Sequence, residues 1–198
     1  MTHNLLTDRL PASLTICGRQ RPVYTDFRRW ILVTELFAEE EIPAGKKLEL
    51  AAKLIFREPA VPSADDPAEW YRSLAEGILW FVSCGKTLPA KNGGHPAHPG
   101  QTEAVFDFTE DAERILAAFW QTYGIDLGDP AVMLHFWKFM ALLRNLPRET
   151  EFMRTVSLRR TDTAKIENDD LRRQIRRAKA EVRIRGNRNA EGKERYYG

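Results

Sequence analysis

The pattern of apolar and polar positions predicts one short hairpin followed by a series of helices. Near the N-terminus, β-branched and aromatic residues at 14–16 and 22–24 flank a polar, glycine-containing connection at 17–21. This is the pattern of two antiparallel strands joined by a turn. A lone hairpin is marginally stable in water, so we expect it to pack on the helices that follow.

Capping residues and chain breaks divide the next part into three helices. The first begins at Thr25 or Asp26, the second follows the break at 43–45, and the third begins at Pro67 directly after its N-cap Asp66. Apolar residues at helical spacing should face the core. They are Phe27, Trp30, Ile31, Thr34 and Phe37 in the first, Leu48, Ala51, Ala52 and Ile55 in the second, and Trp70, Leu74, Ile78, Phe81 and Val82 in the third.

Helical patterns return after a Gly-, Pro- and His-rich segment at 85–102, which we expect to be an exposed loop. One helix runs from Asp107 or Thr109 to Tyr123 and should bury Ile115, Leu116, Phe119, Trp120 and Tyr123. An Asp-Pro cap then opens a helix over 130–145, which is apolar almost all round and should be the most buried element. Its core residues are Val132, Met133, Phe136, Trp137, Phe139, Met140, Leu142 and Leu143. A last short helix should carry Phe152, Met153, Val156 and Leu158.

The C-terminal part has a different pattern, with a narrow apolar stripe among many basic residues. We expect a mainly α-helical core domain at 1–160, a protruding basic amphipathic helical arm at 161–185 and a flexible tail at 186–198. The stripe is too narrow to pack well alone, so the arm should order against a partner. The residues expected to contact that partner are Leu171, Arg172, Ile175, Arg176, Ala178, Lys179, Val182 and Arg183.

Charge separates the same two parts. Residues 154–198 contain 14 Lys/Arg and 7 Asp/Glu, a net charge of +7, whereas residues 1–153 contain 16 and 21, a net charge of −5. Such an arm can bind phosphates or an acidic helical protein. Acidic residues are interspersed in the arm, and 159–185 contains no aromatic residue for base stacking. These features favour a protein partner over nucleic acid.

Composition indicates a folded protein of a reducing compartment. The chain has 198 residues, of which 43% are hydrophobic and 10% aromatic, enough for one packed core. No run approaches the roughly 18 apolar residues of a membrane helix, and no secretory signal is visible. Two cysteines cannot make a disulfide framework.

The histidines do not form a recognisable metal or catalytic site. His95 and His98, with Cys84 as the nearest soft ligand, are too few for a closed zinc site, so we expect solvated loop histidines. His135 lies in the predicted apolar helix without a serine or cysteine nucleophile motif. A hydrogen-bonded core histidine is therefore the better interpretation than a catalytic base.

The acidic clusters and glycine motifs do not indicate catalysis either. The clusters at 39–41 and 65–66 could be paired carboxylates, but a solvated helix end and a helix cap explain them better. The sequence contains no phosphate-binding glycine loop and no nucleophile elbow. We therefore expect a protein that is not an enzyme and that uses no cofactor or metal.

Two blocks of residues resemble the bacteriophage "gp fifteen" family. The first consists of NLLTDRLP at 4–11, the hairpin, and TDFRRWI at 25–31. The second consists of FDF at 106–108, ILAAF at 115–119, YGIDL at 123–127, LHFWKFMALL at 134–143 and LRR at 158–160. Together they cover most of residues 4–161 in the family's order, and the basic C-terminal helix is also similar. The loop at 85–102 departs from the family.

The resemblance implies a role in phage tail assembly. Members are encoded in tailed phages and prophages of Gram-positive bacteria, typically between the tail tube and tape-measure genes. That position implies a tail-assembly chaperone that binds the tape-measure protein in the host cytoplasm and is absent from the finished virion. The tail tube protein and a second copy of the chain are further expected partners, and no active site carries over. The alternative that stays open is a nucleic-acid-binding packaging or regulatory protein that uses the basic arm.

Overall fold

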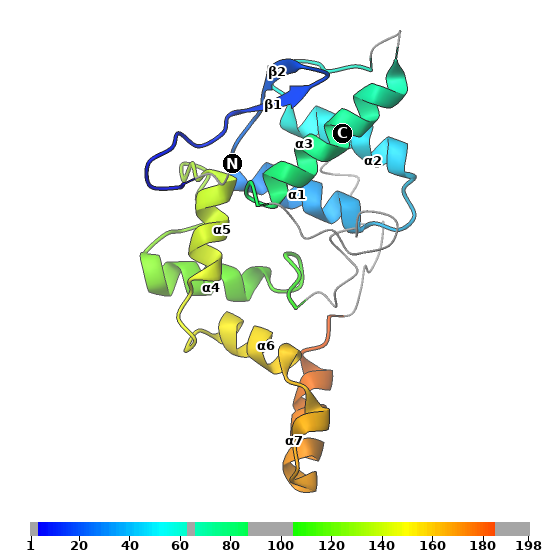
Figure 1. The fold of residues 1–198 in the computed structure, drawn as a ribbon. Coiled ribbons are helices and arrows are strands. Elements are labelled where there is room, and N and C mark those ends of the chain that lie inside the picture. The colour runs from blue at the N-terminus through cyan, green and yellow to red at the C-terminus, as the bar shows by residue number, and fades with distance from the viewer. Residues whose placement is uncertain (1–3, 63–65, 87–104, 185–198) are drawn as a thin grey trace. The chain divides into compact units, whose positions relative to one another are not determined.

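The protein is mainly α-helical, as its sequence predicts (Figure 1). The computed structural model describes residues 4–62, 66–86 and 105–184. Within these residues it has one antiparallel hairpin, seven α-helices and one 3-10 turn. Contacts divide the described residues into two compact units: unit 1 contains 4–62, 66–86 and 133–141, and unit 2 contains 105–132 and 142–184. The predicted domain boundaries at 160 and 185 stay predictions.

The hairpin consists of β1 (Ser13–Ile16) and β2 (Arg19–Pro22), with Leu14 opposite Arg21. Its connection has two residues, Cys17 and Gly18, both with positive φ (48° and 73°). The predicted connection at 17–21 was therefore too long. A two-residue turn with positive φ at both positions matches the right-handed twist of the strands, so Arg19 to Arg21 can pair with β1.

The hairpin packs on a helix of unit 1, as expected. Leu14 and Ile16 are buried, and β1 contacts α3 (Pro67–Val82). Gly77 in α3 lies beneath them: a β-carbon there would be 3.4 Å from Ile16 Cδ1 and 3.5 Å from Leu14 Cδ1. These are ordinary van der Waals distances, so the space between the strand and the helix would accept a methyl group at this position.

Three helices complete the N-terminal part of unit 1: α1 (Phe27–Ala38), α2 (Ala44–Ile55) and α3. The predicted buried face of α2 and the Asp66 cap of α3 are confirmed. The predicted face of α1 was partly wrong. Val33 and Leu36 are buried, whereas Ile31, Thr34 and Phe37 are partly exposed. Apolar residues occur on both sides of α1, so spacing alone could not decide which side faces the core.

Aromatic side chains form the core of unit 1. Trp30 stacks on Phe81 with ring centroids 3.8 Å apart, and Phe27 stacks on Phe139 at 4.7 Å. The indole nitrogen of Trp137 donates a hydrogen bond to the carbonyl of Phe81 (2.8 Å). The polar atom of this buried tryptophan is thereby satisfied, and three helices are joined around one cluster.

The helix predicted for 130–145 is shorter than expected. Helix α5 spans Phe136–Arg144. Of the predicted core residues, Met133 is 80% exposed. The buried ones are Phe136, Trp137, Phe139, Met140 and Leu143. The reason is a backbone pairing that excludes helix: Phe27 N–H donates to the Leu134 carbonyl, and Phe136 N–H donates to the Thr25 carbonyl. The expected Asp129 cap instead forms a turn by accepting a hydrogen bond from Ala131 N–H.

Unit 2 contains α4 (Ala112–Tyr123), α6 (Glu151–Arg160), the 3-10 turn η1 (Thr163–Lys165) and α7 (Asp169–Glu181). Helix α4 contacts α6 and buries Ile115, Ala118 and Phe119. The helix starts later than predicted, because the Asp107 carboxylate accepts hydrogen bonds from Thr109 and Glu110 N–H in a preceding turn. Gly124 ends it in the left-handed conformation (φ 65°), as its position suggests.

Candidate partner-binding surface

The predicted arm contains a helix, α7, that starts after a side-chain cap. Asn168 accepts a hydrogen bond from Leu171 N–H. Helix α7 contacts α6 (Figure 1), and its Lys179 bonds the carbonyl of Thr161, the residue that follows α6. None of the residues of α7 is fully buried. The part of 161–185 beyond Ile184 lies outside the described residues.

Hydrogen bonds hold one side of α7 against its own chain. Lys179 Nζ donates to the carbonyl of Thr161 (2.7 Å), and Arg159 Nε of α6 donates to the carbonyl of Val182 (2.6 Å). Arg172 donates to the carbonyls of Ile166 and Glu167. Two of the basic residues assigned to a partner, Arg172 and Lys179, are therefore engaged within the chain.

The other predicted contact residues separate into two groups by exposure. Ile175, Ala178 and Val182 are partly buried on the inward side. The exposed ones are Leu171, which is 47% exposed, Arg176 and Arg183. Arg173, Arg177 and Ala180 share the exposed side with them. The exposed residues of α7 are thus mainly basic, although Asp169, Asp170 and Glu181 are exposed as well and Arg173 pairs with Asp170. The arginines can bind carboxylates or phosphates in a bidentate manner.

A second exposed surface lies on α4 and was missed by the sequence interpretation. Leu116 and Trp120, both predicted to be core residues, are 42% and 57% exposed. The buried stripe of α4 runs through Ile115, Ala118 and Phe119 instead. The sequence does contain a signal for this exposed surface, because α4 has two apolar stripes. A helix that packs on one neighbour can bury only one of them.

Acidic residues flank this exposed pair. Glu113 is exposed one turn before Leu116. Asp126 Oδ1 caps Gly128 N–H (2.8 Å), and a β-carbon at Gly128 would lie 3.8 Å from Leu116 Cδ1, which places the acidic turn beside the apolar residues. Residues 105–132 contain six Asp/Glu and one Arg. We call Leu116, Trp120 and Glu113 the α4 face; it is apolar with an acidic margin.

Buried charges connect the elements of unit 2. The carboxylate of Asp111, at the N-terminus of α4, is fully buried and pairs with the guanidinium of Arg159. Arg159 also donates to the carbonyl of Val105 (3.2 Å). One side chain of α6 thereby contacts α4, the segment before it and the end of α7.

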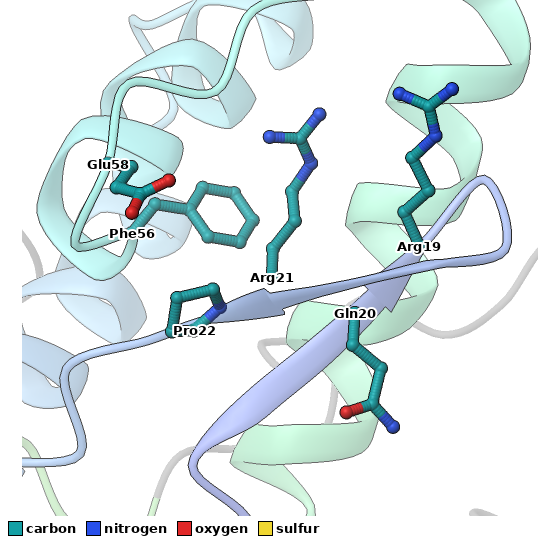
Figure 2. A pocket seen from close by; sticks show the side chains of 6 residues that line it. All are labelled: Arg19, Gln20, Arg21, Pro22, Phe56 and Glu58. Carbon is teal, nitrogen blue, oxygen red and sulfur yellow. The ribbon is translucent and has the colours of Figure 1, made fainter.

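A shallow hollow lies beside the hairpin in unit 1 (Figure 2). Arg19 and Arg21 of β2 lie on the same side of the strand as Phe56 and Glu58, whereas Gln20 points to the opposite side. The volume is about 190 Å³, below the roughly 300–1,000 Å³ of typical ligand pockets. This is an arginine-bearing surface depression, not an enclosed small-molecule site.

His135 is hydrogen-bonded at both ring nitrogens, as expected for a structural histidine. Trp137 N–H donates to Nδ1 (3.1 Å), and Nε2 lies 2.9 Å from the carbonyl of Pro11. Burial is the main cause that lowers the pKa of His135; the Pro11 hydrogen bond opposes it and Lys138 adds to it. The neutral ring with its proton on Nε2 satisfies both contacts.

The other predicted chemical groups are placed as follows. Asp66 accepts a hydrogen bond from Glu69 N–H, so it is a helix cap. Among the residues that the structure describes, no three His, Cys, Asp or Glu side chains gather as a metal site. His95, His98 and Asp65 lie outside the described residues. None of the described helices is long and apolar enough to cross a membrane.

Comparison with known proteins gives one family. Searches of curated proteins and of solved structures gave no match. A family model described as "Bacteriophage Gp15 protein" matches residues 6–184, which include the hairpin, all the described helices and the arm. The matched region is most of the chain and agrees with the resemblance of its two motif blocks. The chain therefore belongs to the bacteriophage Gp15 protein family.

Proposed function

We propose that this phage protein is a tail-assembly chaperone that binds the tape-measure protein and catalyses no reaction. The observation that carries the proposal is the pairing of family membership with an exposed basic helix, α7. The gene position implied by the family resemblance is that of tail-assembly chaperones. The proposed partners act in the host cytoplasm, before the virion is complete.

The physical requirement for such a protein follows from its client. A tape-measure protein is long, helical and partly apolar, so it exposes aggregation-prone surface before tube subunits enclose it. The outward side of α7 offers one exposed leucine, Leu171, next to exposed arginines. Apolar contact would supply affinity, and salt-sensitive charges would allow fast binding and release.

The test is co-expression with the tape-measure protein from the same phage genome. Wild-type protein should raise the soluble fraction of the tape measure and co-purify with it. Leu171→Asp in α7 should reduce both effects, whereas Leu5→Asp should not, because Leu5 is similarly exposed (44% against 47% for Leu171) but lies outside the arm. An equally insoluble tape measure with and without the protein would contradict the proposal.

A nucleic-acid-binding role is the second candidate, and the exposed arginines of α7 favour it. Arg173, Arg176 and Arg177 are exposed on α7, a helix of 13 residues, and Arg183 is exposed just after it. Phosphate binding through such residues predicts affinity that falls steeply with salt. A mobility assay with duplex and single-stranded DNA over a salt series tests this role. No shift below micromolar protein would exclude it.

A further inference from the structure

We infer that the α4 face of one copy binds the outward side of α7 of a second copy. The α4 face is apolar with an acidic margin, and the outward side of α7 is basic. In the part of the chain that the structure describes, both surfaces are exposed. A second copy offers each of them a surface of complementary character. The inference stands apart from the proposed function, because its test contains no tape-measure protein.

The outward side of α7 has a position suited to a large apolar side chain. Ala180 is exposed, and residues three and four positions away on a helix are its surface neighbours. Within α7 these neighbours are Arg176 and Arg177, both exposed, and Arg183 is exposed just after the helix ends. A small residue beside two long side chains leaves room for a large apolar side chain, and Trp120 of the partner, at 57% exposure, is an aromatic side chain that can pack there.

The charges favour the same pairing. An arginine side chain can lie with its methylene groups along the indole of Trp120 and its guanidinium over the ring face. The guanidinium groups then reach the acidic margin, which contains Glu113 and Asp126. Opposite charges around an apolar centre favour fast association and exclude like-charged surfaces.

Intrachain contacts leave the outward side of α7 available for this pairing. Lys179 donates a hydrogen bond to the carbonyl of Thr161, and the carbonyl of Val182 accepts one from Arg159 of α6. These bonds hold the inward side of α7 in place. A pre-positioned helix loses less conformational entropy on binding than an unfolded segment does. The second copy therefore meets an ordered surface.

The size of the contact predicts a reciprocal dimer. Stable interfaces bury about 1,200–2,000 Å², and one helix-on-helix contact with a single tryptophan contributes only part of that. Two copies related by a two-fold axis can form the contact twice, since each chain carries both surfaces. We therefore expect dissociation in the micromolar range rather than an obligate dimer.

The experiment measures self-association of the purified full-length chain by sedimentation and light scattering over a concentration series. Trp120→Ala should raise the dissociation constant roughly tenfold or more, as for a central aromatic residue of an interface. The double change Arg176→Glu with Arg177→Glu should do the same, and added salt should weaken the wild-type dimer. Circular dichroism confirms that each variant is folded.

Two matched controls separate the proposed contact from general surface effects. Met133→Ala removes another exposed apolar side chain, and Arg144→Glu with Arg148→Glu reverses two exposed arginines outside the arm. Neither should change the dissociation constant. A wild-type chain that stays monomeric at roughly 100 μM, above typical micromolar affinity, would overturn the inference. Unchanged association of Trp120→Ala would overturn it as well.

Mixing the two defective variants gives the most direct test. Trp120→Ala retains α7, and the arginine variant retains the α4 face. A mixture should therefore form a heterodimer with one of the two contacts, weaker than wild type but stronger than either variant alone. If the mixture associates no better than its components, the α4 face and α7 do not bind each other and the inference is wrong.

Discussion

The carboxylate of Asp111 and the guanidinium of Arg159 form a two-point ion pair in the interior of unit 2. Arg159 Nη1 lies 2.5 Å from Asp111 Oδ2, and Nη2 lies 3.0 Å from Oδ1. The carboxylate is fully buried and the arginine side chain is 9% exposed. Because 47 residues separate the two positions in the sequence, the pair exists only through the packing of α4 on α6.

Removing either partner of this pair should strongly destabilise unit 2. Asp111→Ala and Arg159→Ala should each lower the free energy of unfolding by about 3–5 kcal/mol, because the remaining charge stays buried without its partner. Arg114→Ala is the control: Arg114 also contacts Asp111, but it is partly exposed, and about 0–1 kcal/mol is expected. Chemical denaturation measures these differences, and equal small losses in all three variants would refute the expectation.

Trp137 should be among the most costly residues to truncate. It is fully buried and donates a hydrogen bond to the carbonyl of Phe81. Trp137→Ala should lower the free energy of unfolding by about 3–5 kcal/mol, as for other large aromatic residues in cores. Met133→Ala nearby in sequence should have little effect, because Met133 is largely exposed. A loss below about 1 kcal/mol for Trp137→Ala would be incompatible with a core position.

Two glycines should respond to the same substitution in opposite directions. Gly85 has φ +70°, and a β-carbon there would lie 2.8 Å from Cη2 of Trp137. Gly85→Ala should therefore destabilise the protein by about 1–3 kcal/mol through strain and steric overlap. Gly77→Ala should be neutral or stabilise by up to about 1 kcal/mol, because its β-carbon meets Ile16 and Leu14 at normal distances in a helix. Thermal melting of the two variants distinguishes these outcomes by the sign of the change in Tm.

Stability should decline at mildly acidic pH because of His135. Its folded pKa is lowered, chiefly by burial, whereas an unfolded histidine titrates near about 6.5. As the pH falls through that value, the unfolded chain takes up the proton first, so the free energy of unfolding decreases until the folded pKa is passed. His135→Gln keeps a donor and an acceptor but does not titrate, and it should flatten the dependence between about pH 7 and pH 5. If the free energy of unfolding of His135→Gln depends on pH as steeply as that of the wild type, groups other than His135 cause the loss of stability.

Truncation after Arg160 should leave the remaining chain folded. No residue of α7 is fully buried, and its removal deprives Arg159 of one acceptor, the carbonyl of Val182. We expect the free energy of unfolding to fall by about 1 kcal/mol, which corresponds to a fall in Tm of about 2–4 °C for a chain of this size. Association with a second copy or with the tape measure should weaken at the same time. A much larger fall in Tm without a change in association would show that the arm belongs to the core.

Much of the fold follows from local patterns that the sequence displays directly. The buried face of α2, at Leu48, Ala51, Ala52 and Ile55, follows from spacing alone, because this helix has polar residues on its other side. The Asp66 cap and the left-handed Gly124 are likewise determined by neighbours within one helical turn. The helix at 169–181 could also be predicted, since its charge and apolar spacing are properties of the sequence; that it forms a partner-binding arm stays a prediction.

The tertiary structure decided what no local pattern contains. Residues 134 and 135 lie outside helix α5 because the backbone of 134–136 pairs with that of 25–27, more than a hundred positions earlier. Of the two apolar stripes on α4, the one that faces α6 is buried and Trp120 is left exposed. Arg172 and Lys179 are engaged within the chain because α7 returns toward α6. Helix propensity and capping act over a few residues, whereas burial depends on which residues from distant parts of the sequence pack against the helix. The sequence therefore determined where helices form, and only packing decided which of their sides remain open to a partner.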